Sequence, residues 1–136
     1  MWMDEVVAGS GQPVESLRRS DDCVFCAIGR FEDVESGRIL IDFPSTYIME
    51  PLYPVVEGHV LVIPRAHVAN AAEDPEVTAK VMEVAATHAQ GVGDCNIITS
   101  VGPFASQTVM HLHVHVVPRR EGDGLALPWG KLNEDC

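Results

Sequence analysis

Three histidines alternate with apolar residues near the C-terminal end of this chain, at positions His111, His113 and His115. Successive side chains of a β-strand point to opposite faces, so this spacing predicts one row of three imidazoles about 6.6 Å apart. Leu112 and Val114 would then line the opposite face and be buried against the rest of the domain. The histidine face is therefore expected to be open for chemistry.

The alternation also fits a half-exposed structural strand, a purification tag or a surface metal patch. The chain has only 6 histidines, however, and none belongs to a terminal tag, so a functional row is favoured. Neutral imidazole is nucleophilic near neutral pH, and its protonated form stabilises phosphate charge or protonates a leaving group. The row predicts phosphoryl chemistry divided among neighbouring histidines.

Cys23 and Cys26 form a second pattern, because a gap of two residues lets two thiolates converge on one tetrahedral ion. They supply half of the ligands of such a site. A redox-active dithiol is disfavoured by the absence of a following βαβ pattern, and two incidental buried cysteines are the remaining reading. With 4 cysteines at uneven spacing, a disulfide framework is not expected.

Composition indicates one folded domain in a chain of 136 residues, of which 46% are hydrophobic and 21% charged. A net charge of −11 disfavours nucleic acid and anionic membranes as partners. A small phosphorylated ligand is compatible with this charge, because local donors outweigh the net field inside a pocket. No apolar run has membrane-spanning length and no secretory signal is visible, so a cytoplasmic location is expected.

The elements that must position these residues follow from hydrophobic periodicity and from glycine and proline breaks. Asp74 and Pro75 read as the start of one main helix that ends near Gln90. The expected strands are 38–43, 47–50, 58–64, 96–99 and 111–117. This order predicts an α+β domain on an antiparallel sheet over residues 21–130, with a flexible N-terminal arm (1–20) and a C-terminal tail (131–136).

The segment from Ser106 to Arg119 resembles the signature of the histidine-triad (HIT) superfamily, and Gly58 to His67 resembles the family's other common block. The resemblance extends from about Cys23 to Trp129 and implies a HIT-like fold with a short N-terminal helix. It also implies a homodimer and a purine nucleotide as the small-molecule partner.

Residue by residue, the resemblance implies that His113 attacks the α-phosphorus and that His115 contacts the phosphate and the departing group. The residues it implies for binding the nucleotide and its phosphates are Ser100, Ser106, Gln107, Thr108, His115 and Trp129. Trp129 is expected either to close over the base or to pack across a dimer interface. His59 and His88 receive no role, because neither belongs to a convergent cluster.

Zinc-containing members of the same family imply a ligand set of Cys23, Cys26, His67 and His111, all present here. Two sulfurs and two nitrogens close a tetrahedral site and leave no position for substrate. The implied zinc is therefore structural, and it would orient the strand that carries His113.

Two positions depart from the family's pattern. Relatives commonly place a ribose-binding aspartate seven residues before Gly58, where this chain has Pro51, with Glu50 one residue away. Ser100 stands where many relatives carry asparagine.

The expected activity is hydrolysis of a nucleoside phosphoramidate or a dinucleoside polyphosphate through a covalent nucleotidyl-histidine intermediate. The alternatives are a nucleotidyltransferase, a catalytically weak nucleotide sensor and a zinc-binding adaptor.

Overall fold

The computed structural model describes residues 22–33 and 35–127, so the predicted arm, the tail and Trp129 lie outside the described residues. The elements, in chain order, are α3 (Val24–Gly29), β1 (Gly37–Asp42), β2 (Thr46–Pro51), β3 (Val60–Pro64), α4 (Pro75–Ala89), β4 (Cys95–Ile98), the 3₁₀ turn η1 (Pro103–Ala105) and β5 (Val114–Pro118). Within the described part, no helix is both long enough and apolar enough to cross a membrane.

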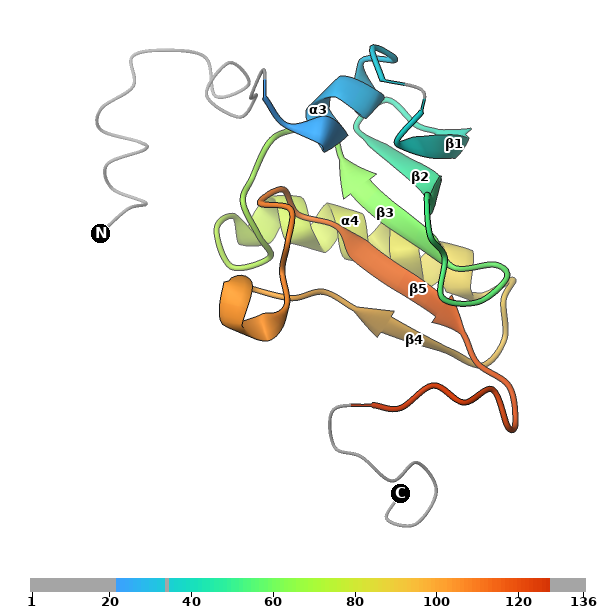
Figure 1. Ribbon diagram of the computed structural model, residues 1–136. Coiled ribbons are helices and arrows are strands. Elements are labelled where there is room, and N and C mark those ends of the chain that lie inside the picture. The colour runs from blue at the N-terminus through green and yellow to red at the C-terminus, as the bar shows by residue number, and fades with distance from the viewer. Residues whose placement is uncertain (1–21, 34, 128–136) are drawn as a thin grey trace, which may run out of the picture.

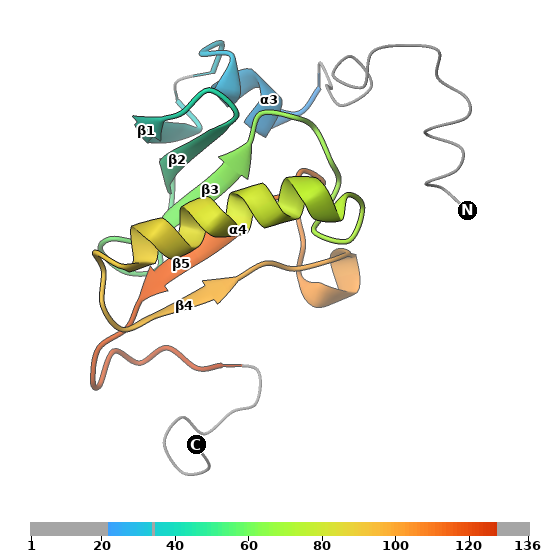
Figure 2. The same ribbon diagram turned by 180° about the vertical axis from the view of Figure 1, so that it is seen from behind.

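The five strands form one sheet in the order β1-β2-β3-β5-β4, and all neighbours are antiparallel. The main helix α4 crosses one face of the sheet over β3 and β5 (Figure 2). The short helix α3 packs near β2 and β3 at one end of the molecule (Figure 1). The predicted α+β architecture, with one main helix and a short N-terminal helix, is confirmed.

Strand β3 is buried along its whole length, as its continuous apolar run predicts. Val62 belongs to the core beneath α4 and packs in one cluster with Val81. The next residue, Ile63, points to the other face and belongs to the core that contains Phe25 of α3. The two cores hold both helices against one central strand, and this arrangement sets the positions of the histidines described below.

The histidine strand begins later than predicted, because β5 starts at Val114 and not at His111. Its partner β3 ends at Pro64, which has no N–H group to continue the ladder. The chain bends at His111, and Leu112 donates its N–H to the Val68 carbonyl at 2.8 Å while its side chain joins Val114 in the core beneath α4. Side chains therefore still alternate, but His111 is fully buried, so the expectation of an open face along all three histidines is wrong.

Helix α4 begins as predicted, with Asp74 as its N-cap and Pro75 in its first turn. The Asp74 carboxylate accepts hydrogen bonds from the backbone N–H groups of Glu76 at 3.1 Å and Val77 at 3.3 Å. These bonds satisfy two of the donors that a helix start leaves unpaired. Because α4 covers β3 and β5, the cap contributes to the support of the histidine strand.

Replacing this cap with Asp74→Ala is expected to lower the free energy of unfolding by about 1 kcal/mol, since two backbone donors lose their acceptor. Urea denaturation followed by circular dichroism measures this change. Asp74→Asn, which keeps an accepting oxygen, should stay within about 0.5 kcal/mol of the parent. Equal losses in the two variants would show that the side-chain oxygen does not stabilise α4.

Candidate active site

The middle histidine, His113, has one ring nitrogen committed and one free. Its Nδ1 lies 2.7 Å from the His111 carbonyl oxygen, which can only accept, so Nδ1 carries the proton. Its Nε2 therefore holds the lone pair, and it makes no hydrogen bond within the described part of the chain. Burial lowers the pKa of His113, while the bond to the His111 carbonyl raises it. The ring is thus neutral with its lone pair on Nε2, which is the state that a nucleophilic imidazole requires.

Neighbours on both sides hold the His113 ring and backbone in place. Thr99, just beyond β4, donates its hydroxyl to the His113 carbonyl at 2.8 Å. The Phe25 ring of α3 meets the imidazole edge to face, with centroids 5.1 Å apart. Contacts to both its backbone and its ring face hold the His113 imidazole in one orientation, so its Nε2 keeps one direction without further ordering.

His115 lies on β5 opposite Leu61 of β3 and Ile98 of β4. Its ring centroid is 5.2 Å from that of His113, at an interplanar angle of 64°. Burial, reinforced by the nearby imidazoles of His113 and His59, lowers the pKa of His115 to about 4. The side chain is therefore uncharged at neutral pH, and its Nε2 has no hydrogen-bond partner among the described residues.

His59 joins this group, and the prediction that it belongs to no convergent cluster is wrong. Its side chain is buried, and its Nε2 lies 3.0 Å from Nδ1 of His115. Its own Nδ1 accepts the backbone N–H of Val55 at 3.1 Å. The sequence contained one signal for this position: His59 precedes Leu61 by two residues and therefore shares its face of the sheet. That Leu61 pairs with His115 depends on the strand register, which sequence spacing does not reveal.

The four predicted metal ligands converge at the start of α3. The ligand atoms of Cys23, Cys26, His67 and His111 all lie within 4.8 Å of one another. Nδ1 of His111 is 3.3 Å from the Cys23 sulfur, 3.6 Å from the Cys26 sulfur and 3.1 Å from Nδ1 of His67. The other nitrogen of His111, Nε2, donates to the Pro64 carbonyl at 2.8 Å, so Nδ1 presents its lone pair to the cluster.

This donor set fits a tetrahedral zinc ion. Zinc bonds of about 2.3 Å to sulfur and about 2.0 Å to nitrogen place tetrahedral donors about 3.3 to 3.7 Å apart. The separations around His111 are close to that range. Burial lowers the pKa of His111 to about 4, which keeps the ring neutral, as a ligand must be. The carbonyl bond to its second nitrogen is the outer contact typical of metal-binding histidines.

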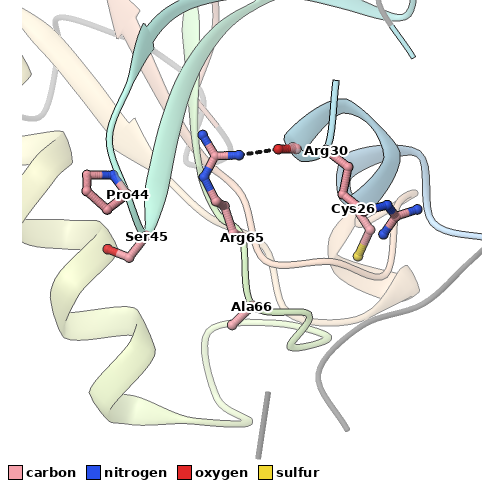
Figure 3. Close-up of a pocket in the computed structure, with 7 residues that line it drawn as sticks. Cys26, Arg30, Pro44, Ser45, Arg65 and Ala66 are labelled. Carbon is pink, nitrogen blue, oxygen red and sulfur yellow. Dashed lines mark hydrogen bonds between the residues drawn. The ribbon is translucent and has the colours of Figure 1, made fainter. Parts of the chain in front are cut away.

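A cavity of about 410 Å³ adjoins this cluster, lined in part by Cys26, Ser45 and Arg65 (Figure 3). The Arg65 guanidinium reaches toward the end of α3 and donates to the Gly29 carbonyl. It also forms an ion pair with Asp42. Arg65 therefore connects α3 to the sheet, and its N–H donors form structural contacts within the protein. The histidines of the triad do not line this cavity.

Gln107 is 4% exposed and fastens the loop between β4 and β5. Its amide nitrogen donates to the carbonyls of Ala69 at 2.7 Å and Val109 at 2.9 Å, and its oxygen accepts from the Gly102 N–H at 2.8 Å. Both amide hydrogens are used by these carbonyls, so binding of a phosphate oxygen by this side chain, which stays a prediction, would require one of these bonds to break. In the present arrangement Gln107 shapes the loop that leads into the histidine segment.

The serine and threonine hydroxyls predicted to bind phosphate lie in this loop and the segment before it. The side chains of Ser100, Ser106 and Thr108 make no hydrogen bond with any described residue and remain free to donate. Ser106 has a φ of 72°, a left-handed conformation that costs energy for a residue other than glycine.

Pro51 stands where relatives commonly have a ribose-binding aspartate, and its neighbour Glu50 forms an exposed ion pair with Arg38 at 3.1 Å.

The fold and the histidine cluster define a HIT-domain protein, and comparison with known sequences agrees. Residues 32–122 match the HIT domain family model, so the chain belongs to the HIT family.

Among characterised relatives, the chain is 34% identical over 125 residues to Adenylylsulfatase HINT3 of Arabidopsis thaliana. That match covers 87% of this chain but only 62% of the longer plant protein. The chain is also 33% identical to Adenosine 5'-monophosphoramidase HNT1 of Saccharomyces cerevisiae, covering 83% of this chain and 73% of that one. Both relatives support nucleotide hydrolysis as the general activity.

Solved structures share the fold. A zinc-bound histidine triad family protein from Mycobacterium smegmatis superposes with a TM-score of 0.65 at 34% identity, covering 77% of this chain and 80% of that one. A HIT family protein from Bacillus anthracis gives a TM-score of 0.71 at 27% identity, covering 84% and 85%. The first of these shows that a HIT protein similar to this chain holds zinc.

Proposed function

We propose that this protein hydrolyses a nucleotide at its α-phosphate through a covalent nucleotidyl intermediate on His113. The observation that carries this proposal is the bond from Nδ1 of His113 to the His111 carbonyl, which leaves the lone pair on Nε2. The neighbouring Nε2 of His115 is also without a partner in the described residues. A nucleophile and a donor side by side are what attack on a phosphate group requires.

The reaction proceeds in two displacements. In the first, the Nε2 lone pair of His113 forms the N–P bond, the bond from phosphorus to the leaving group breaks, and the leaving group takes that electron pair; an amine takes a proton from solvent as it leaves. The bond from Nδ1 to the His111 carbonyl stabilises the positive charge on the substituted ring. In the second, water forms the new O–P bond, the N–P pair returns to Nε2, and the water releases a proton to solvent.

Zinc, when bound, supplies a fixed tetrahedral anchor rather than an open catalytic position. Cys23, Cys26, His67 and His111 would hold it. His111 would then have two functions, because its ring would bind the metal while its carbonyl orients the His113 ring. The metal centre is thus expected to position His113 indirectly, by fixing the backbone that carries it.

The substrate class we propose is an adenosine 5'-monophosphate derivative with an amine, sulfate or second phosphate chain on the α-phosphate. The names of the plant and yeast relatives support the sulfate and amine leaving groups. Incubation with adenosine 5'-phosphoramidate, adenosine 5'-phosphosulfate and a diadenosine polyphosphate tests this choice. Release of AMP that carries one oxygen from ¹⁸O-labelled water is expected. Binding without AMP release from any of the three would favour a nucleotide sensor.

We also propose a homodimer that forms through β4. This strand is one of the two edges of the sheet, and its Ile97 and Ile98 are 37% and 39% exposed. An edge strand with exposed apolar side chains is a template for pairing with a second copy. Light scattering is expected to give twice the chain mass of 14.8 kDa. Ile97→Lys should shift the protein toward monomer, whereas a monomeric parent would refute the dimer.

A further inference from the structure

The contacts around His59 determine where the protons of this histidine pair sit. A backbone N–H can only donate, so the 3.1 Å contact from Val55 makes Nδ1 of His59 an acceptor. The proton of neutral His59 is therefore on Nε2, which faces Nδ1 of His115 at 3.0 Å. That nitrogen must in turn accept. Neutral His115 thus carries its proton on Nε2, the atom that no described residue contacts.

The same contacts oppose protonation of either ring. A second proton on His59 would sit on Nδ1 and meet the Val55 N–H, and a second proton on His115 would meet the Nε2–H of His59. The ionisable groups that act on His115 are the imidazoles of His113 and His59, and both disfavour positive charge. The described surroundings provide no carboxylate that would compensate a charged His115.

We infer that His115 acts as a neutral hydrogen-bond donor through Nε2, and that His59, held by the Val55 amide, is the positioning residue that imposes this state. This inference rests on the proposed hydrolase function for its consequence. His115 would donate to a phosphate oxygen and stabilise the charge that develops there, without giving up its proton. Imidazole used in this way is an electrophile rather than a general acid.

The first test reads the protonation state directly and requires no turnover. Long-range ¹H–¹⁵N spectra of the zinc-loaded protein are expected to show His115 with a protonated Nε2 and an unprotonated Nδ1 from neutral pH down toward its pKa of about 4. In His59→Phe the proton should redistribute, and the ring should protonate at higher pH. A doubly protonated His115 at neutral pH, or one with its proton on Nδ1, would overturn the inference.

The second test separates donation of a hydrogen bond from transfer of a proton. His115→Gln keeps an N–H donor but cannot protonate a leaving group, whereas His115→Ala keeps neither. We expect His115→Ala to lose about 10²- to 10³-fold in kcat, the cost typical of a missing oxyanion donor, and His115→Gln to lose no more than about tenfold. The loss should be equal for adenosine 5'-phosphoramidate and for the 4-nitrophenyl ester of AMP, whose leaving group needs no proton.

An imidazolium acid would give the opposite pattern. Both His115 substitutions would then impair hydrolysis of the phosphoramidate equally and leave hydrolysis of the nitrophenyl ester unchanged.

His59→Phe should lower kcat about tenfold or more while KM changes less than about threefold, because the ring of His115 loses its orientation. Val55→Pro removes the amide donor and should act in the same direction, with Val55→Ala as the control that keeps the N–H. If no variant or parent turns over either substrate, the proposed function fails, while the spectra still decide the state of His115.

Discussion

His113→Ala is expected to reduce hydrolysis of adenosine 5'-phosphoramidate at least about 10⁴-fold, because removal of a covalent nucleophile costs more than removal of any supporting group. The described structure offers no replacement nucleophile, since His115 has its Nδ1 facing His59 and its free Nε2 protonated. Steady-state release of AMP measures the loss. Its size distinguishes a covalent mechanism from one in which the histidines only bind phosphate.

Two controls distinguish loss of the nucleophile from loss of the fold. His88→Ala, on α4 and outside the cluster, should keep the activity of the parent. The Nδ1 bond of His113 to the His111 carbonyl is one hydrogen bond, so His113→Ala should lose about 1 kcal/mol of stability from it and retain its fold and metal. Activity of a folded His113→Ala protein within tenfold of the parent would contradict a covalent role for His113.

Loss of the metal is expected to have the second largest effect, on stability as well as activity. The protein should contain one zinc ion per chain, measured by plasma mass spectrometry. Removal by a chelator should lower the midpoint of thermal unfolding by about 10 °C, which corresponds to a linkage contribution of about 4 kcal/mol. The cause is that α3, the segment after β3 and His111 place their ligand atoms within 4.8 Å of one another, where one ion would join them. Without it, the two thiols and two imidazoles, of which Cys26 and His111 are buried, would share no bound ion.

Cys26→Ser tests the same site without a chelator, because Cys26 is buried among the other ligands. It should abolish stoichiometric zinc and reproduce the loss of stability. Cys95→Ser changes a cysteine outside the cluster and is the matched control. A protein purified without metal, whose unfolding midpoint is the same in the parent and Cys26→Ser, would show that the cluster does not bind a structural ion.

Much of the fold was predictable because its signals are local. The apolar run of β3 indicates a strand buried on both faces, and Asp74 followed by Pro75 marks the start of α4. The start of β5 was not predictable from alternation alone, since an extended segment alternates whether or not it has a pairing partner. Pro64 ends the ladder on the opposite strand, and that effect depends on register.

For the candidate site, too, some residues could be predicted from the sequence and others depend on three-dimensional packing. The resemblance to HIT proteins identified four ligand candidates that do lie together, although they come from three separate segments of the chain. It did not identify His59, whose partner is 56 residues away on another strand. Nor did it show that the Gln107 amide is consumed by three backbone groups. Hydrogen-bond saturation is a property of packing in three dimensions, and residue type does not reveal it.

The measurement that tests the covalent mechanism most directly is intact-protein mass spectrometry after rapid mixing with adenosine 5'-phosphoramidate and an acid-free quench. The parent is expected to gain the mass of one adenylyl group, and peptide mapping should place it on His113. His113→Ala should gain nothing under the same conditions. An adduct that persists in His113→Ala, or AMP release by the parent with no adduct at any mixing time, would contradict a nucleotidyl-histidine intermediate at this position.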